Sequence, residues 1–491
     1  MHVKSLIPEL VPNWIDGQER AADNGQALAN LNPATGAALC RVVRSGAADV
    51  AAAVTAARRA QVAWAGLTPV ARGDLLREAA LLMRARSDQF AEIVSLETGK
   101  SKKDALGETG AAVEMGLFIA GEGRRSYGKT TTSAVLNRTA FVMRQPLGVA
   151  GLIIAANTPV ANVAWKAYPA LLCGNTAVMK ASEDTPVTAW AVAKLFDEVG
   201  IPAGVFNVVQ GYGSEAGAPL VEHPDVDLVS FTGSAAVGSQ IQVKAGARLA
   251  KVCWELGGKN PLIVCDDADL DRAVETAALS AFTNAGQRCA SGSRLIVFDG
   301  IYDRFKMALL EYTRKLRVGP SDDDDLGPVI NQRQLDNMVA AVERARSAGA
   351  AVIIGGGRML DSAHRDGFYM QPTLLEDAAG EAEISQAELF GPIACLYRVA
   401  DFEAAVTLAN ASPFGLTAAI HTANVHRAMT FLGRIRSGVA AINGATYGSE
   451  PHMPFGGLGQ SGTGWREAGT EALDVYSDWK TIYINHDPTA V

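Results

Sequence analysis

The sequence has no apolar segment long enough to cross a lipid bilayer. Its most apolar run, Val149–Ala156, is far shorter than the roughly 20 residues that a membrane-spanning helix requires. The first residues, Met1–Glu9, contain no apolar core of the kind that a secretory signal peptide has. We therefore expect a cytoplasmic protein with no membrane partner.

Cysteine is also scarce, and its distribution excludes two common uses of this residue. The six cysteines form no C-x-x-C pair, and the seven histidines form no H-E-x-x-H motif. In a chain of this size, scattered cysteines are typical of reduced thiols in a cytosol-like compartment, and not of a disulfide framework or a zinc site. We expect no metal. The cysteines are Cys40, Cys173, Cys253, Cys265, Cys289 and Cys395.

The chain has no block of basic residues, and its formal net charge is −8. This balance argues against nucleic acid or an anionic membrane as a partner. The 491 residues are 48% hydrophobic and 20% charged, as in soluble globular proteins. A chain of this length is expected to form about two or three domains.

Hydrophobic periodicity predicts helices in the first quarter of the chain and a strand after them. Apolar residues recur at three- and four-residue spacing over Ala47–Ala65 and Ala71–Glu97. The segment Arg138–Gln145 is rich in β-branched and aromatic residues, which predicts a strand that leaves the compact body. The tail, Ala472–Ile484, has a similar β-type composition.

From residue 149 the pattern alternates between strand and helix, which predicts a parallel α/β sheet with helices on both faces. Ligands of such sheets bind beyond the carboxyl ends of the strands. The polar residues Asn157, Lys180, Thr232 and Glu255 each lie at or just after a predicted strand end. The strands are Val149–Ala155, Thr176–Lys180, Val205–Val209, Leu228–Phe231 and Lys251–Glu255, and the helices are Val160–Cys173, Val187–Val199, Glu215–Val221 and Ala235–Ala245.

A second alternation of strand and helix predicts a second α/β domain that begins near Gly257. Its elements are Pro261–Cys265, Asp269–Phe282, Arg294–Phe298, Tyr302–Leu316, Gln332–Ala348 and Ala351–Ile354.

Two glycine-containing turns are candidates for binding a dinucleotide. Gly211–Gly217 is one residue too long for the Rossmann fingerprint, and an ordinary turn before a helix explains it as well. Phe231–Ser234 follows a strand and opens a helix, where free N–H groups can receive a pyrophosphate, although a simple helix cap explains it equally well. Glu183 can accept the two ribose hydroxyls and would repel a 2′-phosphate, which favours NAD over NADP. Lys180 and Ser182 argue in the opposite direction.

The segment Asn284–Gly292 places Cys289 among small and polar residues. A cysteine thiolate can attack an aldehyde, and an amide such as that of Asn157 can stabilise the resulting oxyanion by roughly 3 kcal/mol. Loss of hydride to a nicotinamide leaves a thioester, which water can cleave with Glu255 as general base. Each residue has a structural explanation when taken alone, as a packing cysteine, a turn cap and a solvated charge. Together with a dinucleotide they form a complete chemical set.

An ordered series of motifs runs through the chain. It consists of Trp165-Lys166 with Pro169-Ala170-Leu171, Gly174-Asn175-Thr176 before Lys180, Phe231-Thr232-Gly233-Ser234, Glu255-Leu256-Gly257-Gly258-Lys259, Gly286-Gln287-Arg288-Cys289, Glu388-Leu389-Phe390-Gly391-Pro392 and Pro454-Phe455-Gly456-Gly457. In these motifs, their order and their spacing, the chain resembles the NAD(P)-dependent aldehyde dehydrogenase superfamily over essentially its full length.

The resemblance implies an aldehyde dehydrogenase-like α/β fold and oxidation of a small-molecule aldehyde to a carboxylic acid. A Rossmann-type NAD(P)-binding domain is expected over 1–126 and 147–256, and an α/β catalytic domain over 257–465. A small β oligomerisation element is expected over 127–146 and 466–491, in a homodimer or homotetramer.

The resemblance also implies roles for individual residues. Cys289 is the expected nucleophile, Glu255 the general base, and Asn157 the oxyanion donor together with the Cys289 backbone N–H. Lys166 is expected near the cofactor and the proton path. The expected cofactor-binding residues are Ile154, Lys180, Ser182, Glu183, Gly213, Phe231, Thr232, Gly233, Ser234, Leu256, Glu388 and Phe390.

The chain departs from the family pattern at Ala155-Ala156-Asn157, where most relatives have Pro-Trp-Asn. The asparagine is retained, but the cofactor loses a bulky neighbour. Polar residues near the expected tunnel, and Arg288 beside the nucleophile, favour a polar, semialdehyde or aromatic substrate over a long fatty aldehyde. The alternative is that Arg288 points away from the tunnel. The candidate substrate residues are Thr158, Asn162, Trp165, Arg288 and Phe455.

Two other functions stay open on the sequence. A CoA-acylating semialdehyde dehydrogenase would pass the acyl group to CoA, but such relatives commonly lack the base glutamate, so Glu255 argues against it. A non-catalytic structural relative is disfavoured because Cys289, Glu255 and Asn157 are all present.

Overall fold

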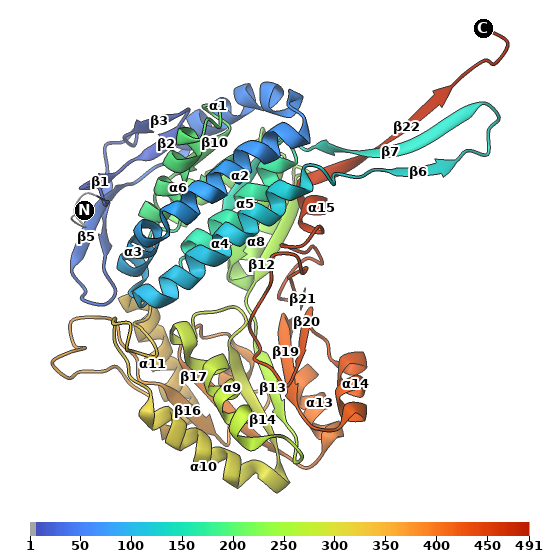
Figure 1. The fold of residues 1–491 in the computed structure, drawn as a ribbon. Coiled ribbons are helices and arrows are strands. Elements are labelled where there is room, and N and C mark those ends of the chain that lie inside the picture. The colour runs from blue at the N-terminus through green and yellow to red at the C-terminus, as the bar shows by residue number, and fades with distance from the viewer. Residues whose placement is uncertain (1–5, 491) are drawn as a thin grey trace.

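The computed structural model describes residues 6–490. The segment Met1–Glu9, for which no signal peptide is expected, lies partly outside this range, as does the last residue of the expected oligomerisation element. Two seven-stranded sheets, each with its own helices, make up most of the molecule (Figure 1). We refer to the first sheet with helices α1–α8 as the first α/β unit, and to the second sheet with helices α9–α14 as the second α/β unit.

The first sheet has the strand order β12-β11-β8-β9-β10-β2-β3. Its five strands from β12 to β10 are parallel, as predicted, and the antiparallel strands β2 and β3 from the N-terminal region extend the sheet beyond β10. The strands are β2 (Asn13–Ile15), β3 (Gln18–Arg20), β8 (Val149–Ile153), β9 (Thr176–Lys180), β10 (Phe206–Val209), β11 (Leu228–Gly233) and β12 (Lys251–Leu256).

Helices cover both faces of this sheet, because successive strand residues point to opposite sides. Val149 and Ile153 of β8 pack with α1 (Ala47–Gly66), α7 (Ala218–Glu222) and α8 (Ala235–Gly246). Ala150 and Leu152 belong to a second core on the other face. The helices of that core are α2 (Pro69–Ala85), α3 (Ser87–Thr98), α4 (Lys102–Glu122), α5 (Pro159–Leu172) and α6 (Pro186–Glu198).

The second sheet has the order β15-β16-β17-β14-β13-β19-β20, and all its neighbours are parallel except β15 with β16. Its strands are β13 (Asn260–Val264), β14 (Gly292–Phe298), β15 (Ala351–Ile354), β16 (Thr373–Glu376), β17 (Ile393–Val399), β19 (Thr417–His421) and β20 (Val439–Ile442). The helices are α9 (Leu270–Phe282), α10 (Asp299–Lys315), α11 (Gln332–Ser347), α12 (Glu383–Gln386), α13 (Phe402–Asn410) and α14 (Val425–Arg434).

Three smaller sheets complete the structure. One contains β1 (Leu10–Val11), β4 (Ala27–Leu31) and β5 (Ala38–Val43), and another pairs β18 (Phe414–Gly415) with β21 (Leu458–Gly459). The third, which we call the arm, joins β6 (Lys129–Thr132), β7 (Arg138–Pro146) and β22 (Ser477–Asn485). The arm projects from the body of the molecule (Figure 1), as predicted for the strand around Arg138–Gln145.

Three sequence-based predictions differ from the structure. Ala71–Glu97 is not one helix, because Arg86 leaves the helical conformation (φ −110°, ψ 22°) and the Ser87 hydroxyl donates to the Arg84 carbonyl at 2.7 Å. Ala472–Tyr476 is a short helix, α15, and not part of the tail strand. The segment predicted as the helix Glu215–Val221 begins as a π-helical turn, η2 (Gly213–Gly217), before α7.

Candidate active site

The carboxyl ends of the parallel strands of the first sheet lie on the same side of the sheet, as predicted. The strands β12, β11, β8 and β9 are consecutive neighbours. Thr232 pairs with Glu255 in the register of β11 and β12, and Ile153 pairs with Lys180 in that of β8 and β9. The polar residues at the strand ends therefore lie on the carboxyl-terminal side of this sheet.

The nucleophile candidate, Cys289, lies in a loop of the second α/β unit with an uncommon backbone. After α9, the residues Asn284, Ala285 and Gly286 have left-handed φ values of 55°, 52° and 66°. A side chain at Gly286 would meet the Gly391 carbonyl oxygen at 2.0 Å, so only glycine fits there. Such conformations cost about 1–3 kcal/mol each for residues with side chains and persist only where packing holds them.

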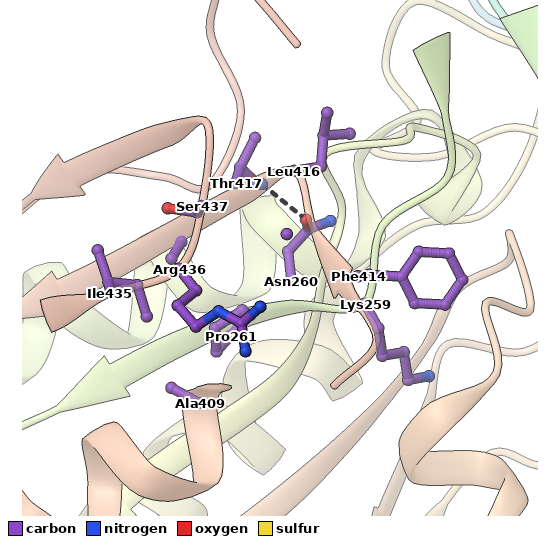
Figure 2. A pocket seen from close by; sticks show the side chains of 12 residues that line it. Lys259, Asn260, Pro261, Ala409, Phe414, Leu416, Thr417, Ile435, Arg436 and Ser437 are labelled. Carbon is purple, nitrogen blue, oxygen red and sulfur yellow. Dashed lines mark hydrogen bonds between the residues drawn. The ribbon is translucent and has the colours of Figure 1, made fainter. Parts of the chain in front are cut away.

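Asn260, at the start of β13, anchors the backbone of the nucleophile. Its Nδ2 donates to the carbonyl oxygens of Cys289 and Ser291, each at 2.8 Å, while its Oδ1 accepts from the Thr417 N–H at 3.1 Å. Figure 2 shows Asn260 and this last bond in a pocket of the second α/β unit. The Cys289 loop is thereby fixed to β13 and β19.

Asn157 of the first α/β unit reaches the Cys289 loop. Its Nδ2 donates to the Gln287 carbonyl oxygen at 3.0 Å, and its Oδ1 accepts from Asn162 Nδ2 at 3.4 Å. Because the Asn157 amide has two N–H groups, one holds the side chain in place and the other can serve an oxyanion. Asn162, a candidate substrate residue, therefore contacts the oxyanion candidate. It also donates to the Ala155 carbonyl at 3.2 Å.

Glu255 is buried, and neither of its carboxylate oxygens has a hydrogen-bond partner within residues 6–490. Burial raises its pKa well above the usual value, and the charge of Glu467 raises it further. Burial also raises the pKa of the Cys289 thiol to about 12, and the charges of Glu255 and Glu388 add to this effect. The charges of both carboxylates therefore favour the protonated thiol.

Lys166 lies in a fully buried ion pair that the sequence did not reveal. Its Nζ is 2.5 Å from Glu467 Oε1 and donates to the Ser230 hydroxyl at 2.8 Å. The Ser230 hydroxyl in turn donates to Glu467 Oε1 at 2.9 Å. Glu467 is 301 residues from Lys166 in the chain, so no local motif pairs them. The only available signal was that a buried lysine requires a counter-charge.

The residues expected to hold the adenosine half of a dinucleotide lie at the ends of β9 and β11. Lys180 Nζ pairs with Glu183 Oε2 at 2.9 Å; burial alone would raise the pKa of Glu183, but Lys180 outweighs it and lowers that pKa. The Ser182 hydroxyl accepts the Asp184 N–H at 3.3 Å. The Ser234 hydroxyl caps α8 by accepting the Val237 N–H at 3.4 Å, as the helix-cap alternative predicted.

The other residues expected to bind the cofactor lie at or near the ends of the parallel strands of the first sheet. A side chain at Gly233 would meet the Phe231 ring at 2.4 Å, and Thr232 is partly exposed between them. Ile154 and Leu256 are buried. Gly213 begins η2, beyond the end of β10.

Glu388 occupies a cradle that only glycine permits. Its Oε1 accepts the Gly258 N–H at 3.0 Å, and a side chain at Gly257 would meet Oε2 at 1.7 Å. Burial raises the pKa of Glu388 to about 7, although the Gly258 N–H and Lys259 oppose the shift. Phe390 follows with a left-handed φ of 57°. A partly buried carboxylate facing a side-chain-free cradle fits a ligand that offers hydroxyl groups, such as a ribose.

The candidate substrate residues surround the same region without forming one cluster of polar groups. Trp165 and Phe455 pack edge to face, with 5.5 Å between ring centroids. The Arg288 guanidinium stacks over the Tyr447 ring at 4.6 Å and makes no hydrogen bond or ion pair with any residue in 6–490. Thr158 is the N-cap of α5, but its side chain makes no capping bond.

Comparisons with known proteins identify the family of the chain. The model of the aldehyde dehydrogenase family matches residues 20–482. The chain is 40% identical to the alpha-ketoglutaric semialdehyde dehydrogenase of Bacillus subtilis (strain 168) over 475 residues, which cover 96% of this chain and 97% of the relative.

The chain is also similar to solved structures of an aldehyde dehydrogenase. The betaine aldehyde dehydrogenase of Staphylococcus aureus in complex with NAD+ superposes with a TM-score of 0.96 and 32% identity, covering 99% of this chain and 97% of that one. A point mutant of that enzyme, with NAD+ and a BME-modified cysteine, gives a TM-score of 0.95 at 32% identity, covering 97% of this chain and 98% of that one.

The chain therefore belongs to the aldehyde dehydrogenase family. It is an NAD(P)-dependent enzyme that oxidises an aldehyde, and the predicted α/β fold class is confirmed. Across residues 6–490, no helix combines the length and apolar character that crossing a membrane requires.

Proposed function

We propose that this enzyme converts a carboxylate-bearing semialdehyde to the corresponding acid through an acyl-enzyme on Cys289. The observation that carries the proposal is that Asn157 bonds to the Cys289 loop, through its 3.0 Å bond to the Gln287 carbonyl. The charge of buried Glu255, whose carboxylate oxygens have no partner within residues 6–490, raises the pKa of the Cys289 thiol, which supports a place for Glu255 in the same site.

In the first step, the Cys289 thiol loses its proton to water, the thiolate sulfur forms a bond to the aldehyde carbon, and the carbonyl π electrons move to oxygen. The second N–H of the Asn157 amide and the backbone N–H of Cys289 donate to this oxyanion. NAD(P), when bound, accepts the hydride that leaves the same carbon. The acyl group then remains on Cys289 as a thioester.

Hydrolysis requires a base, and Glu255 is suited to that role. Its pKa is raised by burial and by Glu467, so its carboxylate, once formed, holds a proton more strongly than an exposed carboxylate does. Water adds to the thioester carbon while Glu255 removes its proton. The C–S bond then breaks, the sulfur takes the proton from Glu255, and the acid and the Cys289 thiol are released.

The adenosine end of the site favours NAD over NADP. Glu183 is ionised beside Lys180, so its carboxylate can accept ribose hydroxyls and repels a 2′-phosphate. That two solved structures of one relative contain NAD+ supports this preference. A second, buried hydrogen-bond network joins the side chains of Lys166, Glu467 and Ser230. This network can exchange protons with the site.

Arg288 is the residue that we assign to the substrate carboxylate. A guanidinium that stacks on Tyr447 and has no acceptor within residues 6–490 is available for a bidentate bond to a carboxylate. The name of the Bacillus subtilis relative, a semialdehyde dehydrogenase, supports this class of substrate.

A pair of aldehydes of equal length tests this assignment. We expect Arg288→Leu to weaken kcat/KM for succinic semialdehyde by about tenfold or more, the lower end of the range for a hydrogen bond to a charged group, and to leave butanal almost unchanged. Arg304→Leu, at an exposed position of α10, is the matched control. Wild-type enzyme that prefers long alkanals to semialdehydes would refute the substrate class.

Two further variants test the chemistry. Cys289→Ala should abolish turnover and still bind NAD. Glu255→Gln should release NADH in one burst and then stall, because the thioester is no longer hydrolysed. Steady turnover by either variant contradicts the assigned role, and acyl-CoA formation that outpaces acid release in the presence of CoA contradicts hydrolysis itself.

We also propose that the arm joins copies of this chain into a homodimer or homotetramer in a reducing, cytosol-like compartment. The arm exposes Trp479, Tyr483 and Ile484 by 38%, 60% and 51%, and its outer strands β6 and β22 each have one unpaired edge. All six cysteines are free thiols. Light scattering of full-length protein tests the assembly, since a monomer at micromolar concentration contradicts it.

A further inference from the structure

A buried ion pair outside the groups discussed so far touches the oxyanion candidate. Lys100 follows α3, Glu108 lies on α4, and the two residues are only 5% and 8% exposed. Lys100 Nζ lies 2.7 Å from Glu108 Oε2. Burying two charges costs about as much free energy as their attraction returns, so such a pair is weak evidence for stability alone.

Each member of the pair also bonds to the segment that carries Asn157. Lys100 Nζ donates to the Asn157 carbonyl oxygen at 2.8 Å. Glu108 Oε1 accepts the N–H groups of Val160 and Ala161, at 3.0 and 3.4 Å, at the start of α5. Glu108 thus supplies the helix cap that the Thr158 side chain does not make.

The position of Lys100 is itself fixed by the second α/β unit. A side chain at Gly99, which has a left-handed φ of 72°, would meet Pro328 Cγ at 2.4 Å, and one at Gly327 would meet Lys100 Cα at 3.2 Å. Gln287 Nε2 donates to the Pro328 carbonyl oxygen at 3.1 Å. The Lys100 ammonium and the Gln287 carbonyl, which hold opposite ends of Asn157, are therefore both fixed to the same segment of chain.

We infer that Lys100 and Glu108 are positioning residues, which set the Asn157 amide at the point where the oxyanion of the Cys289 adduct forms. The inference rests on the proposed role of Asn157. Neither residue needs to touch the substrate, because Lys100 acts on the Asn157 backbone and Glu108 on the first turn of α5. Small misplacement of a group that acts in the transition state lowers the rate strongly, by about 10²-fold for a shift of roughly 1 Å.

The acylation step can be measured without a cofactor. The Cys289 thiolate can attack p-nitrophenyl acetate, forming the S–acyl bond and expelling p-nitrophenolate, through the same kind of oxyanion. The p-nitrophenol burst rate is compared for Lys100→Met, Asn157→Ala and the variant that combines both. A double variant, Lys100→Met with Glu108→Gln, is also measured. It leaves no unpaired buried charge and therefore keeps the test valid if the Lys100→Met protein does not fold.

The control is Lys306→Met, which breaks the Lys306–Glu376 pair (26% and 16% exposed side chains) between α10 and β16. It is expected to lower the melting temperature and leave the burst rate unchanged. Each variant is also tested for NAD affinity, to separate a local effect from a general loss of structure.

We expect Asn157→Ala to slow the burst by about 10²-fold and Lys100→Met by about tenfold, with the KM for the ester and the NAD affinity within about twofold of wild type. Because Lys100 acts through Asn157, the combined variant should be no slower than Asn157→Ala alone. Multiplied losses in the combined variant, or an unchanged burst in both Lys100 variants, overturn the inference. An unchanged burst in Asn157→Ala instead overturns the proposed role of Asn157.

Discussion

The affinity of this enzyme for NAD should rise with pH near neutrality, because Glu388 titrates there. Burial raises the pKa of Glu388 to about 7, and its Oε1 already accepts the Gly258 N–H. Only the ionised carboxylate offers all its lone pairs to ribose hydroxyls, whereas the protonated form has lost an acceptor. Affinity should therefore be lost as pH falls through this pKa.

The size of the effect follows from the ionised fraction. With a pKa of about 7, roughly one tenth of Glu388 is ionised at about pH 6 and roughly nine tenths at about pH 8. If only the ionised form binds, the apparent Kd is the intrinsic Kd divided by that fraction, so it should fall by about tenfold across this interval.

Isothermal titration calorimetry on the Cys289→Ala variant measures this Kd without chemistry. Glu388→Gln should bind NAD more weakly and with little pH dependence between about pH 6 and pH 8, because a neutral amide does not titrate there. Glu403→Gln, at an exposed position on α13, serves as the control. A flat Kd in the Cys289→Ala protein, or a retained slope after Glu388→Gln, would refute the reasoning.

Three more changes have defined outcomes. Gly257→Ala places a Cβ 1.7 Å from Glu388 Oε2, so it should displace that carboxylate and abolish the pH dependence of NAD binding in the same calorimetric titration. The pKa of Cys289 is about 12, and the thiolate is the reactive form. The rate of alkylation by iodoacetamide, measured by mass spectrometry, should therefore rise about tenfold per pH unit between about pH 7 and pH 9. A plateau in that range contradicts the raised pKa. Lys166→Met leaves Glu467 buried without its partner and should cost about 3–5 kcal/mol of unfolding free energy in urea titrations; a loss below about 1 kcal/mol would show that the pair is not held as described.

The parallel strands were predictable because they are buried on both faces. The run Thr176–Lys180, for example, coincides with β9 at both ends, and all its residues are buried. The predicted strand Ala351–Ile354 also coincides with β15, although this edge strand is antiparallel to β16 and only partly buried. The edge strands of the N-terminal region were not predicted, since β3 is exposed throughout and has no alternation to detect. In α15, Val475 and Tyr476 have β-type propensity but lie fully buried against the core, so tertiary packing decides their conformation.

The candidate site also contains residues that the sequence predicted and residues that it did not. The rule that polar residues follow strand ends located Asn157 and Glu255, because sheet geometry alone brings such positions together. The residues that support them were not found. Glu467, Lys100 and Glu108 come from separate helices and loops, and only three-dimensional packing places them beside Lys166 and Asn157. Ser234 caps α8, as one of the two interpretations of its motif predicted, while its role at a pyrophosphate stays a prediction.

The connection between the two sheets limits how the enzyme can exchange its ligands. Strand β12 ends at Leu256 and β13 begins at Asn260, so only Gly257–Lys259 joins the two α/β units at this point, a tether of roughly 10 Å at full extension. The chain returns beside it, where Gly462 bridges to Glu255 and Glu467 to Phe455. We expect these two short crossings to limit how far the two α/β units can separate at this point. Aldehyde and acid should then exchange without a wide opening of the molecule, and a covalent crosslink between the two units should leave the turnover rate largely unchanged.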